Sequence, residues 1–319
     1  MAQLKKLQKL IKKRRRRNFF QRLGQIINIY QISQKKKKMG QIKSKIIKNL
    51  MNKKQYTSLE SFTNSYLIYH EILDLNFSQR LYEEHALIIQ NAIKKCQQLK
   101  NLTLNLSQNQ LNFQTLQLIM NGIHECLNLQ FLNLNLRNVC LKDKGEYLGS
   151  SIAKNRNIQH LTLKMHNNSI HNQDAYDIVL GISKCTKLTN LALIFNSNND
   201  IEDQGISFIG QSLAQFKNLQ NLKLVIWFNN KGVACLQNLQ MGIAQCENLS
   251  ILTLIIGFQN KQITQQSINT LAYQIKAWKK LTSLSLILDI QILTGQRNYI
   301  IDLQAKKLER LVSLKIIYL

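Results

Sequence analysis

Residues 184–195 read KCTKLTNLALIF, and a phrase of the same pattern returns along most of the chain. Counted from Leu188, apolar residues follow three, five and seven positions later, so that an apolar residue recurs at every second position from Leu191 to Phe195. Such alternation predicts a strand with one buried face. The phrase begins at positions spaced by 29 to 32 residues, namely Leu99, Leu129, Ile158, Leu188, Leu219, Leu249, Leu281 and Leu311. A period this steady indicates an array of structural repeats.

The residues ahead of each phrase follow a different rhythm. Before Leu188, apolar residues stand at Val179, Ile182 and Cys185, and spacings of three and four are typical of one apolar helix face. A row of small residues runs beside this face in successive repeats: Ala92, Gly122, Ser151, Gly181, Ser212 and Gly242. We expect these residues to let neighbouring helices approach closely, at some loss of helix propensity.

Four of the six cysteines share one place in the repeat, three residues before the phrase. They are Cys96, Cys126, Cys185 and Cys246, and the other repeats carry Asn155, Phe216, Trp278 and Leu308 there. This set of residue types shares no redox or metal chemistry, whereas it suits the buried last turn of a helix. We therefore expect reduced thiols that pack in the core of an intracellular protein, with no metal site and no cofactor.

The whole unit, LxxLxLxL followed by a polar loop and GxxxL(G)xxIxxC/NxxL, resembles the leucine-rich repeat of the long, ribonuclease-inhibitor-like type. The loop-to-helix turn is plainest in two copies, Leu141-x-Asp143-x-Gly145 and Ile201-x-Asp203-x-Gly205. The resemblance implies an α/β solenoid shaped like a horseshoe, with a parallel sheet on its concave side and helices on its convex side. It also implies a binding protein, but it does not identify the partner.

The chain departs from this resemblance just after the strand. The asparagine that the family usually has there is irregular, because eight residues past the phrase starts stand Ser107, Arg137, His166, Asn196, Trp227, Gly257 and Asp289. We therefore expect loop geometry to vary more than strand geometry.

Basic charge is concentrated at the N-terminus. Residues 1–54 hold 19 of the 43 Lys and Arg residues and no Asp or Glu. We divide the chain into a basic tail, residues 1–56, that is disordered or partly helical, and a repeat domain, residues 57–319, with about eight to nine repeats. Two blocks of like charge dominate the tail: Lys12, Lys13, Arg14, Arg15, Arg16 and Arg17, then Lys35, Lys36, Lys37 and Lys38.

Several roles fit this tail. Its two basic blocks resemble a bipartite nuclear-import signal, and its charge also suits contact with nucleic acid or an anionic membrane. A mitochondrial targeting segment, a solvated tail with no single partner and a misassigned start codon are the alternatives. No run of about 18 apolar residues occurs, so we expect no transmembrane span. The predicted location is the nucleus or cytoplasm, with the mitochondrion as an alternative.

Strand residues that alternate with the buried leucines are expected to face the concave side. The third such row is polar in its first three members and apolar in its last five, which are Ile194, Val225, Ile255, Ile287 and Ile317. Aligned apolar side chains on a wet face favour a partner site, with Trp227 nearby as an aromatic anchor. In the alternative interpretation, loops or the tail cover this stripe, or β-propensity alone selected its residues.

Catalytic motifs are absent from the sequence. It contains no GxxxxGK[ST], GxSxG or HExxH motif, and His160, His166 and His171 lack acidic or cysteine partners at ligand spacing. We therefore predict a non-catalytic scaffold that binds a protein on its concave face. The alternatives are an activator of a small GTPase, and a nucleic-acid-associated protein that uses its basic tail. The sequence stops at Leu319 directly after a strand phrase, which predicts association through an uncapped end or a longer parent chain.

Overall fold

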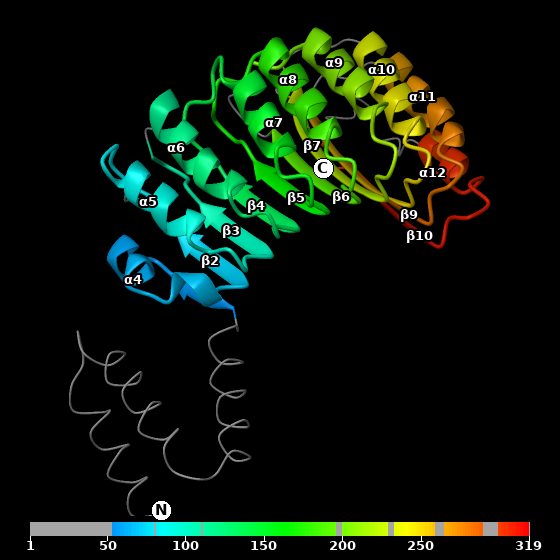
Figure 1. Cartoon of the computed structure of the whole chain (residues 1–319). Helices are drawn as coiled ribbons and strands as arrows, with labels where there is room; N and C mark the ends of the chain where they lie inside the picture. Colours follow the sequence, from blue (N-terminus) through cyan, green and yellow to red (C-terminus); the bar gives the residue numbers. More distant parts are fainter. Residues whose placement is uncertain are drawn as a thin grey trace, which may run out of the picture. The chain divides into compact units, whose positions relative to one another are not determined.

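The leucine phrases form the strands of one parallel sheet (Figure 1). The computed structural model describes residues 53–79, 81–109, 111–195, 200–228, 233–258, 265–289 and 299–318. Within these residues ten strands lie in chain order: β1 (Lys54–Tyr56), β2 (Ile72–Asn76), β3 (Asn101–Asn105), β4 (Phe131–Asn135), β5 (His160–Lys164), β6 (Asn190–Phe195), β7 (Asn221–Phe228), β8 (Ile251–Phe258), β9 (Ser283–Asp289) and β10 (Ser313–Tyr318).

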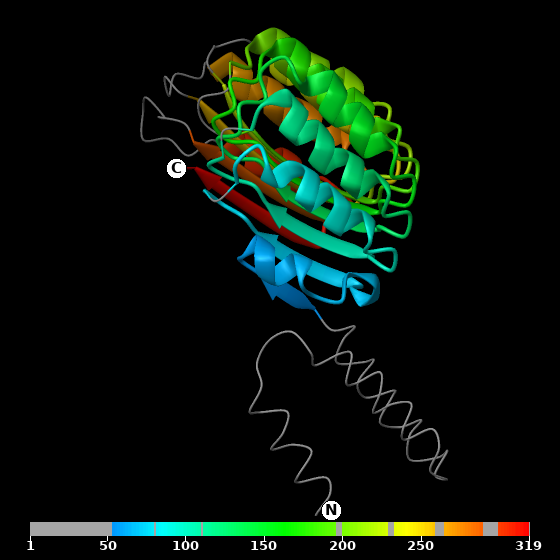
Figure 2. The ribbon, with the colours of Figure 1, turned by 60° about the vertical axis from the view of Figure 1, so that its left-hand side comes forward.

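A helix precedes nearly every strand and covers the same face of the sheet (Figure 2). The α-helices are α4 (Leu59–Thr63), α5 (His85–Lys94), α6 (Phe113–His124), α7 (Gly145–Ala153), α8 (Asn172–Ser183), α9 (Asp203–Leu213), α10 (Val233–Ala244), α11 (Gln265–Gln274) and α12 (Tyr299–Ala305). Two short 3-10 helices, η1 (Leu67–Tyr69) and η2 (Ile275–Ala277), complete the layer. The repeats of the described residues therefore form an α/β solenoid, as predicted.

The core lies between the two layers. In β3, Leu102 and Leu104 are buried, while the residues on either side of each leucine face outward. This alternation recurs from repeat to repeat. Because Leu102 pairs in register with Leu132, and Leu104 with Leu134, the leucines form continuous rows inside the solenoid. Each repeat thus buries its apolar face mainly against its neighbours.

The small-residue row lies where successive helices touch. A Cβ added at Gly181 would overlap the backbone of Gly149 in the neighbouring helix. A Cβ added at Gly242 would overlap the backbone of Gly210 in the same way. Glycine is required at these places because the backbones approach too closely for any larger residue. The expectation of close helix approach is confirmed at these two contacts.

A buried asparagine closes the loop after the strand, two residues later than the family pattern suggests. Asn109 donates from Nδ2 to the carbonyls of Phe77 (2.9 Å) and Leu106 (2.8 Å), and its Oδ1 accepts from the backbone N–H of Leu81 (3.0 Å). Asn168 plays the same role, with bonds to Leu136 O (2.7 Å) and Val139 N (2.9 Å). These amides satisfy backbone groups that would otherwise be buried without partners.

The shared cysteine position also has a hydrogen-bonding role. Cys126 Sγ lies 3.4 Å from the carbonyl oxygen of Ile93, near the end of the preceding helix. Asn155 Nδ2 donates to Ile123 O at 3.1 Å, and Cys246 Sγ lies 3.2 Å from Leu213 O. The side chain at this position therefore both packs in the core and contacts a helix-terminal carbonyl of the repeat before it.

The sheet begins slightly before residue 57. β1 pairs with β2 in parallel, and Tyr56 lies opposite Leu75. Residues 54–56, which the sequence division places in the tail, therefore belong to the first strand of the sheet.

Candidate functional site

The apolar stripe forms one continuous row across the concave side. Ile194 pairs in register with Val225, Val225 with Ile255, Ile255 with Ile287, and Ile287 with Ile317. Four of the five side chains are half-buried, whereas Val225 is only 4% exposed. The surface that the row offers to a partner therefore comes from the other four residues.

Trp227 lies beside this stripe, two residues past Val225 on β7. It pairs in register with Gly257, and a Cβ added there would lie 2.6 Å from the indole ring. The missing side chain of Gly257 thus makes room for the indole against the neighbouring strand. Among the described residues the indole Nε1 has no hydrogen-bond partner, although solvent barely reaches it. Trp227 is half-buried, so part of its apolar surface remains available.

A second feature lies on the first strands of the same side. Phe131 and His160 stack face to face, with ring centroids 4.0 Å apart and ring planes 8° apart. They line a shallow depression of about 350 Å³ that is otherwise surrounded mainly by polar side chains, including Asn101, Thr103 and Asn133. An aromatic platform with amides and hydroxyls beside it can bind a planar or apolar group while hydrogen bonding its polar neighbours.

Few of the outward residues on this side of the sheet are charged. Burial lowers the pKa of His160, so its ring is neutral at pH 7 and stacks without a charge. Asp74 forms an ion pair with Lys53 at 3.0 Å and accepts a hydrogen bond from Gln55 at 3.0 Å. Asn, Thr and Ser make up most of the remaining outward residues. Lys164, Lys223 and Lys315 also face outward on β5, β7 and β10, so this side of the sheet carries separate positive charges among its amides and hydroxyls.

No metal or thiol chemistry is visible in the described part of the chain. No cluster of three His, Cys, Asp or Glu residues there could hold a metal ion. Burial raises the pKa of Cys126 and Cys246 to about 12, which keeps both thiols protonated and unreactive. Cys140 is the exposed thiol of the six.

The basic blocks at Lys12–Arg17 and Lys35–Lys38 lie outside the described residues. The roles and the location predicted from them stay predictions. Within the described ranges, no helix is both long enough and apolar enough to cross a bilayer.

The structure brings together residues that the sequence placed only in rows. Phe131 and His160 occupy the first outward row in neighbouring repeats. Their equivalent positions in the sequence could have indicated that the two rings stack. The sequence did not predict the buried Asn109 and Asn168, because the repeat pattern places its asparagine two residues earlier. The predicted stripe residues do form one row, and their role in binding stays a prediction.

No protein-family model and no curated protein matches the chain. Among solved structures, it is similar to an LRR protein of Leptospira interrogans, with 16% identity, a TM-score of 0.27, and coverage of 82% of this chain and 77% of that chain. It is also similar to the plant peptide hormone receptor RGFR1 in complex with RGF2, with 14% identity and a TM-score of 0.25. That match covers 82% of this chain and 45% of the receptor chain.

Proposed function

We propose that the chain is a non-catalytic scaffold that binds a protein partner on the concave side of its sheet. The observation that carries this proposal is the in-register row of Ile194, Ile255, Ile287 and Ile317, half-buried on a side that is otherwise mostly polar. Apolar side chains that remain partly in contact with water gain free energy when a partner covers them.

The two features of the concave side define the chemistry of the partner. The apolar row suits aliphatic or aromatic side chains, and the Phe131–His160 platform suits a ring or a peptide group. The amides and hydroxyls between them supply hydrogen bonds. The expected partner is therefore an extended or convex protein surface with an apolar end and a polar end.

Affinity capture from native lysate with three forms of the full-length chain tests this proposal. The forms are the wild type, Ile255→Lys on the concave side, and Gln211→Lys on the exposed side of α9. We expect the wild type and Gln211→Lys to retain the same protein, and Ile255→Lys to lose it, because a charge in an apolar contact is costly. Retention of every captured protein by a folded Ile255→Lys chain would contradict the proposal.

A further inference from the structure

One edge of the solenoid is built from the loops that join each helix to the next strand. Backbone hydrogen bonds run along this edge from repeat to repeat: Gln130 N to Lys100 O (2.8 Å), Gln159 N to Gln130 O (2.8 Å), Thr189 N to Gln159 O (2.9 Å) and Gln220 N to Thr189 O (2.8 Å). The loops therefore lie side by side. We call this edge the helix-end flank, and it comprises residues 66–71, 94–100, 124–130, 154–159, 184–189, 214–220, 244–250, 275–282 and 305–312.

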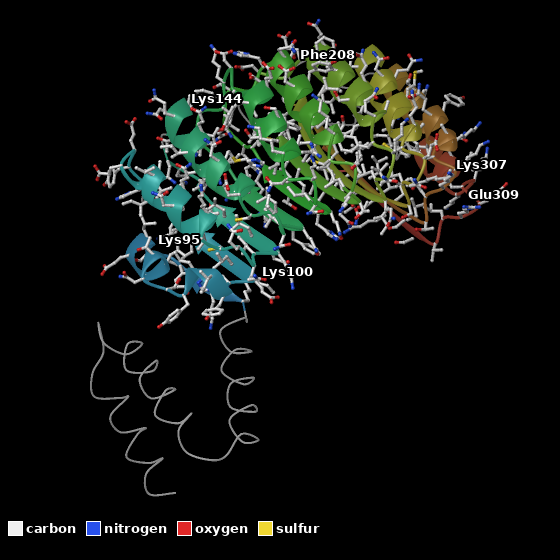
Figure 3. All side chains as sticks on the ribbon, in the orientation of Figure 1. Lys95, Lys100, Lys144, Phe208, Lys307 and Glu309 are labelled. Atoms are coloured by element: carbon white, nitrogen blue, oxygen red, sulfur yellow. The ribbon has the colours of Figure 1, made fainter. Side chains whose placement is uncertain are left out.

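The helix-end flank is strongly basic. It carries 14 Lys and Arg residues, all exposed, and four Glu residues. Among the described residues its one ion pair joins Lys100 to Glu71, at 3.0 Å. The opposite edge, residues 77–84, 106–112, 136–144, 165–171 and 200–202, has three basic and five acidic residues in its described part. Figure 3 labels Lys95, Lys100 and Lys307 on the helix-end flank, and Lys144 on the opposite edge.

Helix ends account for only part of this charge. Lysines in the last turn or at the C-cap, such as Lys94, Lys154 and Lys184, offset the negative end of the helix dipole. Arg156, Lys217 and Lys280 lie beyond the helices, so the dipole does not explain them. Like charges held together along one edge repel one another, and an anionic surface would remove that cost.

Exposed apolar side chains lie among these bases. Leu127 is 65% exposed and Val312 is 89% exposed, each in a loop of the helix-end flank. Ile68 and Tyr69 are also exposed on the same edge. Apolar tips surrounded by lysines fit the interface of a lipid bilayer, where the tips enter the headgroup region and the lysines meet anionic lipids. The phosphate backbone of a nucleic acid would contact the lysines and arginines but would leave the exposed apolar side chains in water.

We propose that the helix-end flank is a docking surface for an anionic lipid bilayer. Twelve of its 14 bases are lysine, which acts as a point charge and suits diffuse attraction to lipid headgroups rather than bidentate recognition of one phosphate. This surface is separate from the concave side.

Binding of the full-length chain to vesicles tests the charge on the flank. The flank triple variant is Arg156→Glu, Lys217→Glu and Lys280→Glu; the matched control on the opposite edge is Arg137→Glu, Lys142→Glu and Lys144→Glu. Both triples change the net charge equally and keep the tail intact. On phosphatidylcholine vesicles containing phosphatidylserine, we expect the flank triple to weaken partitioning by about tenfold or more and the control by about twofold or less. An equal loss in both triples would overturn the proposal.

A second measurement separates a bilayer from a nucleic acid. Leu127→Trp and Tyr82→Trp place an indole on the flank and on the opposite edge at similar exposure, 65% and 70% for the native residues. On the same vesicles with brominated lipids, we expect quenching of the added tryptophan in Leu127→Trp and none in Tyr82→Trp. Failure of Leu127→Trp to quench would overturn the proposal. The proposal would also be overturned if the wild type bound duplex nucleic acid more tightly than vesicles, and if the flank triple lost the nucleic acid binding but kept the vesicle binding.

Discussion

The two halves of the concave side share one backbone and differ in chemistry. From β2 to β5 the outward residues are polar, apart from Ile72 and the stacked pair Phe131 and His160. From β6 to β10 the third outward row is aliphatic throughout. The inward leucine rows continue unchanged beneath both halves. Packing therefore fixes the inward positions, while the outward positions are free to vary and, in the proposed function, carry the binding chemistry.

The largest expected effect comes from breaking the helix layer beneath one half. Gly242→Val should lower the free energy of unfolding by about 3 kcal/mol, because the valine side chain would overlap the backbone of Gly210. Chemical denaturation measures the loss, and hydrogen exchange should show that β7 and β8 lose protection before β3 and β4. Ser150→Ala on an exposed helix face is the control. Unchanged stability in Gly242→Val would contradict the close helix contact.

In the polar half, the buried asparagine is the corresponding weak point. Asn168→Ala should destabilise the domain by about 2 kcal/mol, because the backbone groups of Leu136 and Val139 lose their partner while buried. Thermal and urea unfolding test this expectation. Gln173→Ala removes an exposed amide bond to Asp177 and should cost less than about 0.5 kcal/mol. Equal effects would mean that Asn168 is not a structural residue.

Truncation in each half shows whether the partner spans both. Phe131→Ala and Ile255→Ala should each raise the Kd of the partner retained by the wild type about five- to tenfold, because each removes apolar contact area. Titration of the purified partner against each variant measures the two effects. A loss in one variant alone would confine the binding site to one half.

The smallest effect concerns the cysteines, which lie in both halves. Burial raises the pKa of Cys96 to about 12 and that of Cys185 to about 11, so the folded state keeps protons that the unfolded state releases above pH 9. Stability should therefore fall as pH rises, by about 0.4 kcal/mol per buried thiol at pH 9.

Thiol titration at pH 8 should give a fast reaction at Cys140 and slow reactions elsewhere. Fast reaction of several thiols would contradict the burial of the other cysteines in the core.

Much of the fold could be predicted from periodicity. The leucine rows, the helix faces and the close approach at Gly181 and Gly242 all follow from spacing, because spacing decides which side chains share a face. The role of Asn109 could not be read in the same way, because the next repeat carries Val139 at the equivalent position and so breaks the pattern. The sequence also placed β1 in the tail, since a strand of three residues is too short to show alternation.

The candidate site was harder to predict. Register alone placed Ile194, Ile255, Ile287 and Ile317 in one row, but the burial of Val225 depends on how its neighbours pack. The stacking of Phe131 on His160 depends on side-chain rotamers, which a sequence pattern does not contain. The repeat pattern put Trp227 and Gly257 at equivalent positions, but the room for the indole over Gly257 depends on the side-chain rotamer of Trp227.

The most direct test of binding on the concave side is a photo-crosslinking measurement in native lysate. A photoreactive amino acid would replace Thr253, which faces outward between Ile251 and Ile255, or Gln211 on the opposite, helical side as the control. We predict that the chain with the label at position 253 crosslinks one defined protein, whereas the chain with the label at position 211 does not. Crosslinking of the same protein from position 211, and none from position 253, would contradict the account.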